Sequence, residues 1–223
     1  METKQETRPV KITGCMTAPR YVNCYCRNII DAAFRKTGIP LQVSGGVFYG
    51  QCMQKMLEDS IAAGVDVAVT VDGDSVFTAN DLMQVIQTLV QSDADAVSCF
   101  QARRGDAVIL ASLRQGNSIQ VGDEPIKVAT AHFGLTAIDL HKLARVPKPW
   151  FITTADAQGE FGDGRVDDDI HFWRQWEKAG NSLYIDPKVR IGHLEEMVVV
   201  HDATTYETKH VYPSQWVKEC LSS

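Results

Sequence analysis

An Asp-Gly-Asp triplet, Asp72 to Asp74, follows the apolar run VAVTV that begins at Val67. The run has no alternation of polar and apolar residues, which predicts a strand buried on both faces, as in the middle of a parallel sheet. Ligands of open α/β sheets bind outside the carboxyl ends of such strands. Asp-Gly is also a common turn pair that needs no ligand. The place of the two carboxylates, more than their residue type, therefore indicates a site.

The elements that must position these carboxylates alternate between strand and helix over residues 10–103. Gly38 and Gly64 end two predicted helices, and Thr78 with Asp81 forms a capping-box pattern ahead of a third. This alternation predicts an α/β fold with right-handed crossovers and a mostly parallel central sheet flanked by helices. Strands are predicted over 10–16, 39–45, 66–71 and 95–103, and helices over 21–38, 50–64, 78–92 and 167–180.

Beyond Arg104 the chain mixes short strands and turns, which predicts a small antiparallel extension. A loop over 146–166 leads into the amphipathic helix that starts at Asp167, in which Trp173 and Trp176 face the core. Residues 182–195 supply a strand and an exit loop, and a tail of mixed structure follows. Neither a linker nor an internal repeat interrupts the chain, so we expect one domain over residues 1–223.

Composition bounds the class of protein. The 223 residues are 44% hydrophobic and carry a net charge of −6, which fits an ordinary globular domain and disfavours, without excluding, a nucleic-acid partner. The six cysteines show neither a CxxC pair nor zinc-ligand spacing, so we expect reduced thiols. The polar start and the absence of a long apolar run predict no signal peptide and no membrane segment, hence a cytoplasmic protein.

Two enzyme families place Asp-x-Asp at the end of a strand. Phosphatases of the haloacid-dehalogenase type do so after their first strand, whereas here two strand–helix units come first. The stretch DVAVTVDGDSVFTANDLMQVI, from Asp66, resembles the Asp-x-Asp region of GT-A glycosyltransferases, especially family 2-like enzymes. AHFGLTAIDL, PWF with VDDDIHFWRQWEKAG, and LYIDPKVRIGHLE resemble three further segments of that family and occur in its order. The ordered set is more specific than any one segment.

This resemblance implies a nucleotide-sugar-binding half over 1–104 and an acceptor-binding half with the C-terminal tail over 105–223. It implies a divalent cation, Mn²⁺ or Mg²⁺, held by Asp74 and His193, with Asp72 contacting the ribose or a metal-bound water. The cation would act as a Lewis acid on the leaving nucleoside diphosphate, and the imidazole favours Mn²⁺. The implied donor-binding residues are Thr17, Ala18, Pro19, Arg20, Tyr49, Gln51, Asp72, Gly73 and Gly134.

The start of the late helix supplies the expected general base. The family has Glu-Asp there and this chain has Asp168-Asp169, so Asp169 takes the base position and the role of Asp168 stays open. Asp167 is interpreted as a first-turn carboxylate that is stabilised by the helix dipole. Trp150, in a proline-flanked loop, is expected to stack on the acceptor. We expect the other four histidines considered to be structural and not metal ligands: His132, His171, His201 and His210.

The predicted function is transfer of a sugar from a nucleotide-diphosphate sugar, with UDP favoured, to a hydroxyl of a small molecule, a polysaccharide or a modified nucleic acid. A base carboxylate favours single displacement with inversion, yet retaining enzymes on this fold also use Asp-x-Asp and a late histidine, so both stereochemical courses stay open. Two alternatives remain: a phosphatase or nucleotidyltransferase, and a binding module without turnover. Each makes a different use of the same strand end.

Overall fold

The structure, a computed structural model, describes residues 8–18, 21–102, 111–112, 122–162, 164–201, 204–205 and 207–222. Its centre is a mixed sheet in the order β2-β1-β3-β9-β5-β10-β4, with β7 paired to β10 off this path. The first three strands are parallel, and β9 lies antiparallel between β3 and β5. The strands are β1 (Ile12–Ala18), β2 (Leu41–Gly45), β3 (Val67–Val71), β4 (Ser75–Val76), β5 (Ala96–Gln101), β7 (Ile126–Lys127), β9 (Thr136–Asp139) and β10 (Leu183–His193).

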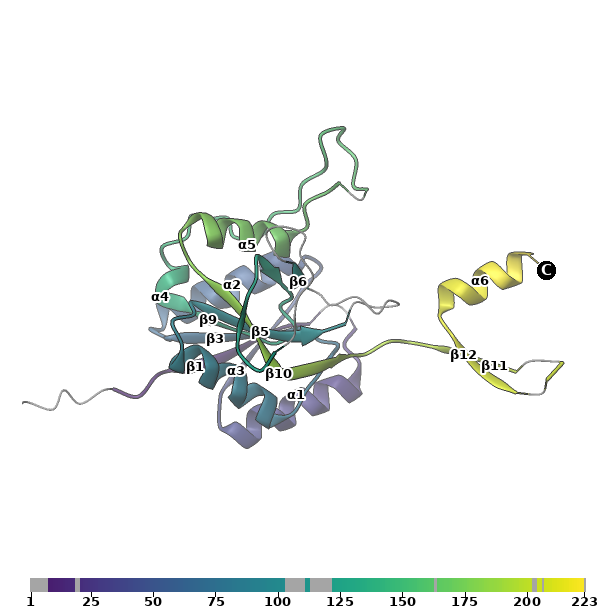
Figure 1. The fold of residues 1–223 in the computed structure, drawn as a ribbon, viewed down its shortest axis with the longest axis horizontal. Helices are drawn as coiled ribbons and strands as arrows, with labels where there is room; N and C mark the ends of the chain where they lie inside the picture. The colour runs from purple at the N-terminus through teal and green to yellow at the C-terminus, as the bar shows by residue number, and fades with distance from the viewer. Residues whose placement is uncertain are drawn as a thin grey trace, which may run out of the picture.

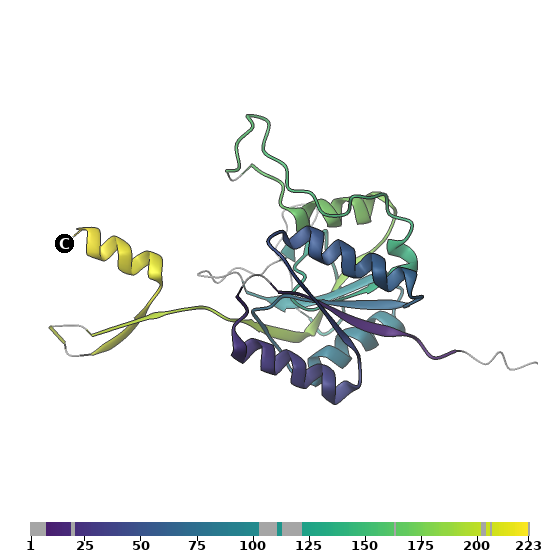
Figure 2. The same cartoon turned by 180° about the vertical axis from the view of Figure 1, so that it is seen from behind.

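Helices cover both faces of this sheet (Figures 1 and 2). On one face, α2 (Tyr49–Ala62), α4 (Leu140–Leu143) and α5 (Asp168–Lys178) pack over a core that includes Trp173 and Trp176. On the other, α1 (Cys24–Thr37) and α3 (Ala79–Gln91) pack over an aliphatic core. β6 (Ala111–Ser112) and β8 (Thr130–Ala131) form a separate antiparallel pair. The predicted α/β architecture with a small antiparallel extension is confirmed.

Local sequence signals account for these elements. All five residues of β3 are buried, as its unbroken apolar character predicts. Thr78 and Asp81 form the predicted capping box at the start of α3, with Thr78 N–H donating to Asp81 Oδ2 over 2.8 Å. Gly38 closes α1 with φ of 71°, a conformation that costs glycine little. The antiparallel insertion of β9 is the feature that alternation alone did not predict.

The pairing of β4 with β10 brings the Asp-Gly-Asp turn next to His193. His193 lies opposite Ser75, and Leu194 N–H donates to the Asp74 carbonyl over 2.9 Å. The Asp-Gly-Asp turn at the end of β3 therefore meets the end of β10, from the other half of the sequence. The sheet edge formed by the carboxyl ends of β1, β2, β3 and β10 holds the candidate site.

Two segments project from this body (Figure 1). One is the loop between α4 and α5, whose foot is closed by a bridge between Thr154 and Val166. The other is the C-terminal segment, in which β11 (Val198–His201), β12 (Thr208–Val211) and α6 (Pro213–Ser222) lie apart from the central sheet. Among the described residues, no helix is long and apolar enough to cross a membrane.

Candidate functional site

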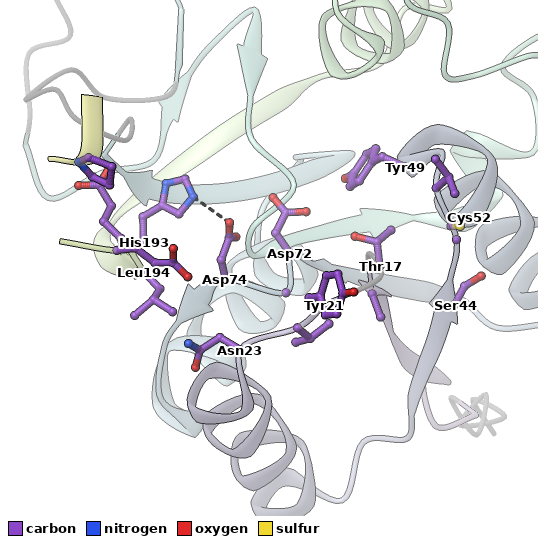
Figure 3. A pocket seen from close by; sticks show the side chains of 18 of the residues that line it. Thr17, Tyr21, Asn23, Ser44, Tyr49, Cys52, Asp72, Asp74, His193 and Leu194 are labelled. Carbon is purple, nitrogen blue, oxygen red and sulfur yellow. Dashed lines mark hydrogen bonds and ion pairs between the residues drawn. The ribbon is translucent and has the colours of Figure 1, made fainter. Parts of the chain in front are cut away.

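A cavity of about 1130 Å³ opens at this sheet edge (Figure 3). The ends of β1 and β2 contribute Thr17, Ala18 and Ser44, and the start of α2 contributes Tyr49 and Cys52. The Asp-Gly-Asp turn lines its centre, and the exit of β10 lines the opposite side. The cavity is large enough for a nucleotide-sized ligand, because ordinary ligand pockets measure roughly 300–1,000 Å³.

The Asp72–Asp74 turn is held against the end of β1. Ser75 N–H donates to the Asp72 carbonyl over 3.1 Å, which closes the turn. A Cβ at Gly73 would lie 3.3 Å from the Thr17 carbonyl oxygen, so glycine allows close packing there. The backbone thus presents both carboxylates to one cavity, as the sequence predicts for ligands at a strand end.

Asp74 and His193 lie next to each other at the wall of the cavity, with 3.3 Å between Asp74 Oδ2 and His193 Nε2 (Figure 3). His193 Nδ1 lies 3.1 Å from the Ala102 carbonyl oxygen. A carbonyl can only accept, so Nδ1 carries the hydrogen, and in the neutral ring Nε2 is then a second acceptor facing a carboxylate. A cation shared by Nε2 and Oδ2, whether a proton or a metal ion, removes this conflict.

Tyr49 connects the turn to the start of α5. It packs edge-on against Phe133 and Phe151, with ring centroids 6.4 and 6.1 Å away. Burial raises the pKa of Tyr49 well above its ordinary value, and the negative charges of Asp72, Asp168 and Asp169 raise it further. The phenol therefore stays protonated at neutral pH, and the carboxylates of both motifs lie in its surroundings.

The two carboxylates at the start of α5 are half-buried. Burial is the main cause that raises the pKa of Asp169 to about 6; the Ile170 N–H opposes it, and the charges of Asp168 and Asp167 add to it. Burial likewise raises the pKa of Asp168, the hydrogen bond from the Asp169 N–H opposes this rise, and the charge of Asp167 adds to it. The Asp167 side chain is 47% exposed and forms an ion pair with Arg165 over 2.6 Å. A carboxylate whose pKa lies near 6 is suited to general-base chemistry.

The other predicted donor residues fall in different places. Thr17 and Ala18 line the cavity, whereas Pro19 and Arg20 lie outside the described residues. Gln51 is exposed on α2 and does not line the cavity, so its expected donor contact is not supported.

Gly134 lies behind the turn and does not line the cavity. A Cβ there would approach Gln101 Oε1, Ser75 Oγ and His132 Nδ1 to within 2.7–2.9 Å, so only glycine fits. His132 Nε2 donates to the Cys99 carbonyl over 2.8 Å, and burial lowers the pKa of this histidine to about 4. Gly134 and His132 therefore pack behind the Asp-Gly-Asp turn, and the expected contact of Gly134 with a donor stays a prediction.

Trp150 is not an acceptor platform. Its side chain is 1% exposed, and its indole N–H donates to the Val146 carbonyl over 3.0 Å. The Lys148 ammonium lies 5.2 Å from the ring centroid. The prediction was wrong because a proline-flanked loop was read as exposed, whereas its tryptophan completes the core beneath α2. The exposed aromatic residue of the loop is Phe161, at 65%.

Several cavity residues were not predicted from the sequence. Glu195 and Glu196 follow His193 closely enough that the same motif could have suggested them. Tyr212 and Gln215 reach the cavity only because the β11–β12 hairpin returns the chain, and Tyr212 donates to Glu195. Ser44 lines the cavity next to Thr17 because β2 pairs with β1.

Neither protein-family models nor curated proteins give a match to this sequence. Solved structures do match. The A197 protein from STIV superposes with a TM-score of 0.62 at 12% identity, with 91% of this chain and 94% of that chain covered. The mannosyltransferase PcManGT from Pyrobaculum calidifontis, in complex with GDP-Man and Mn²⁺, gives 0.52 at 13% identity over 88% of this chain and 58% of that one. GalNAc-T7 with UDP, GalNAc and Mn²⁺ gives 0.50 at 10% identity over 85% and 44%.

The chain has the GT-A fold. Within this GT-A fold, no group of three or more His, Cys, Asp or Glu side chains among the described residues is arranged to hold a metal ion. The Asp74–His193 pair still fits two ligands of a divalent ion, since the Ala102 carbonyl orients the imidazole as a ligating histidine requires. Mg²⁺ sites in phosphate-using enzymes commonly take the remaining ligands from substrate phosphates and water.

The raised pKa of Asp169 makes a prediction about stability. A carboxyl group whose pKa is higher in the fold than in the unfolded chain stabilises the fold below pH 3.8, and this contribution is lost as the pH rises through about 6. Asp169→Asn should therefore be more stable than the wild type at pH 7.5, by up to about 3 kcal/mol for roughly two pKa units. The gain should vanish near pH 3.5. Urea denaturation at both pH values measures it.

Asp167→Asn is the matched control, because Asp167 is exposed and ion-paired with Arg165. It should change stability by only a few tenths of a kcal/mol, on the order of a surface charge in a first helical turn. Equal or lower stability of Asp169→Asn at pH 7.5 would contradict the buried placement of this carboxylate.

Proposed function

We propose that this protein is a metal-dependent glycosyltransferase that moves a sugar from a nucleotide-diphosphate sugar to an acceptor hydroxyl. The observation that carries the proposal is the meeting of the Asp-Gly-Asp turn and His193 at one cavity. Asp168 and Asp169 do not line this cavity, but they lie near enough to Tyr49, which does, for their charges to raise its pKa. The GT-A fold supports it, since the two transferases of similar fold were solved with nucleotides and Mn²⁺. Membership of family 2 and a cytoplasmic location stay predictions from the sequence.

The charge of the cavity favours metal dependence. Four carboxylates line it, from Asp72, Asp74, Glu195 and Glu196, and no lysine or arginine is found among the lining residues that the structure describes. A diphosphate would meet net repulsion from these groups. Asp74 and His193 would hold Mn²⁺ or Mg²⁺, with Asp72 nearby, and the bound ion would neutralise charge on the departing nucleoside diphosphate. Oxygen ligands suit both ions, and the imidazole favours Mn²⁺.

The chain's own residues would place the donor. Thr17, Ala18 and Ser44, at the adjacent ends of β1 and β2, offer backbone and hydroxyl groups for the nucleoside, with Arg20 proposed for the diphosphate. Tyr21 is 91% exposed at the cavity mouth and presents a ring face for a nucleobase. Tyr49, a protonated phenol near Asp72, would offer a hydrogen-bond donor to the sugar. A UDP-sugar remains the favoured donor.

Asp169 would act as general base. With a pKa of about 6 it is ionised at neutral pH, yet basic enough to take the proton of an acceptor hydroxyl as that oxygen attacks the anomeric carbon. A single displacement of this kind inverts the configuration at that carbon. The acceptor would be a hydroxyl on a small molecule, a polysaccharide or a modified nucleic acid, approaching from the α5 side of the cavity.

The metal proposal predicts coupled binding. A nucleoside diphosphate should bind at least tenfold more tightly with Mn²⁺ than with chelator, because the cation offsets the four carboxylates. Asp74→Ala should lose this coupling while folding normally, since it removes a ligand and no core volume. Titration calorimetry with UDP and GDP measures both, and Asp59→Ala, an exposed carboxylate paired with Lys55, is the control. Equal affinity with and without Mn²⁺ in the wild type would remove the metal from the proposal.

The base proposal predicts separation of binding from chemistry. Asp169→Asn keeps the shape of the side chain and its acceptor oxygen, so nucleotide affinity should be unchanged. Transfer or donor hydrolysis at saturating donor should fall by roughly 10²–10⁴-fold, as expected for loss of a positioned base. In the wild type the rate should fall as the pH drops below about 6, as Asp169 gains a proton next to Asp167, Asp168 and Tyr49.

Two outcomes would overturn this assignment. Near-normal turnover in Asp169→Asn would exclude it as the base. Donor binding by the wild type without transfer or hydrolysis across nucleotide-sugars would favour a binding module, and release of phosphate from generic phosphoesters would favour a phosphatase.

A further inference from the structure

One face of α2 joins the two halves of the chain. Gly50, Gln54 and Glu58 are spaced four residues apart, so they lie in a row along the helix. Each contacts the segment that leads into α5 or α5 itself. Gln54 Oε1 accepts from Trp150 N–H over 3.0 Å, and Glu58 Oε1 pairs with Lys148 Nζ over 2.8 Å. At the N-terminal end of the row, the Asp168 carboxylate packs against Gly50, where a Cβ would lie 3.1 Å from Asp168 Oδ2.

The local sequence provides no side-chain hydrogen-bond acceptor for the first N–H groups of α2. The first N–H groups of a helix have no partner within it. The residue at the cap position of α2 is Phe48, whose side chain makes no capping hydrogen bond. Asp168, distant in sequence, places a carboxylate oxygen beside Gly50 and accepts from the Asp169 N–H over 3.0 Å. One carboxylate thus lies between the first turns of α2 and α5.

Side chains are closely packed where Gly50 meets Asp168. A Cβ at Gly50 would lie 2.6 Å from Phe151 Cβ and 3.1 Å from Asp168 Oδ2, so only glycine admits the approach. Phe151 in turn stacks on Phe172, with ring centroids 5.0 Å apart. Phe172 lies one helical turn after Asp168. The backbone of α5 is therefore fixed relative to Tyr49, which begins α2 and lines the cavity.

We propose that Asp168 is a positioning residue, which caps α2 through Gly50 and so holds the neighbouring Asp169 in register with the donor cavity. This gives the two adjacent carboxylates of α5 different roles. Asp168 acts on the backbone of α2, and Asp169 acts on the acceptor. The role for Asp169 rests on the proposed glycosyltransferase function, whereas the tether between α5 and α2 does not.

Two substitutions separate the hydrogen bond from the charge. Asp168→Ala removes the acceptor oxygen, and Asp168→Asn keeps one while removing the charge. Hydrogen exchange of the Gly50 N–H, followed by NMR, should be on the order of tenfold faster in Asp168→Ala, as for loss of a helix cap, and close to wild type in Asp168→Asn. Asp167→Ala, which removes the neighbouring carboxylate that pairs with Arg165, should leave Gly50 exchange unchanged.

Kinetics of the same variants test the functional half. Asp168→Ala should lower the transfer rate at saturating donor by roughly 10- to 100-fold through misplacement of Asp169, with donor KM within about twofold of wild type. Asp168→Asn should restore most of the rate. Gly50→Ala, which forces α2 away from Phe151, should reproduce the Asp168→Ala phenotype and serves if Asp168→Ala folds poorly.

The outcomes distinguish the parts of the proposal. Unchanged Gly50 exchange in Asp168→Ala would overturn the tether. A loss of transfer in Asp168→Asn as large as in Asp168→Ala, with Gly50 still protected, would assign Asp168 a direct part in the chemistry and overturn the positioning role. If the wild type transfers no sugar while Gly50 exchange follows the predicted order, the glycosyltransferase proposal fails and the tether stands.

Discussion

The antiparallel pairing of β4 with β10 is the contact on which the site depends. Two residues of β4 are enough to place His193 opposite Ser75, and so its imidazole beside Asp74. Without this pairing, the carboxylates at the end of β3 would form an ordinary turn. With it, an acceptor nitrogen and an acceptor oxygen lie 3.3 Å apart at the wall of a cavity, and that arrangement is stable only with a cation between or on them.

The remaining elements position this pair relative to the α5 carboxylates. β3 is buried on both faces, so the turn that follows it cannot shift without disturbing both cores. α2 links the two halves through a row of contacts on one face and begins at Tyr49, whose phenol lies among the carboxylates of both motifs. Burial, with a smaller contribution from neighbouring carboxylates, raises the pKa values of Asp168 and Asp169. Such raised values are typical of sites in which function, and not stability, has determined the residue.

Much of the fold was predictable because it rests on local signals. The Thr78–Asp81 capping box, the helix ends at glycine and the uniform burial of β3 follow from neighbouring residues, as does the strand-end position of Asp72 and Asp74. The placement of His193 near Asp74 was expected only through the resemblance of ordered segments. Exposure was not predictable in the same way. Trp150 was expected to face an acceptor, yet its burial depends on the packing of the 148–151 segment along α2, which no local pattern reveals. The packing of Asp168 against Gly50 joins residues far apart in sequence, so no local pattern reveals it.

The central claim is that Asp74 and His193 together hold a divalent cation that receives the diphosphate of the donor. Crystals grown with Mn²⁺ and a nucleoside diphosphate, with anomalous scattering recorded at the manganese edge, test it most directly. The account predicts one strong anomalous peak bonded to Asp74 Oδ2 and His193 Nε2, at about 2.0–2.3 Å, and in contact with the diphosphate oxygens. A diphosphate bound in the cavity with no manganese at this pair, or manganese held elsewhere, would contradict it.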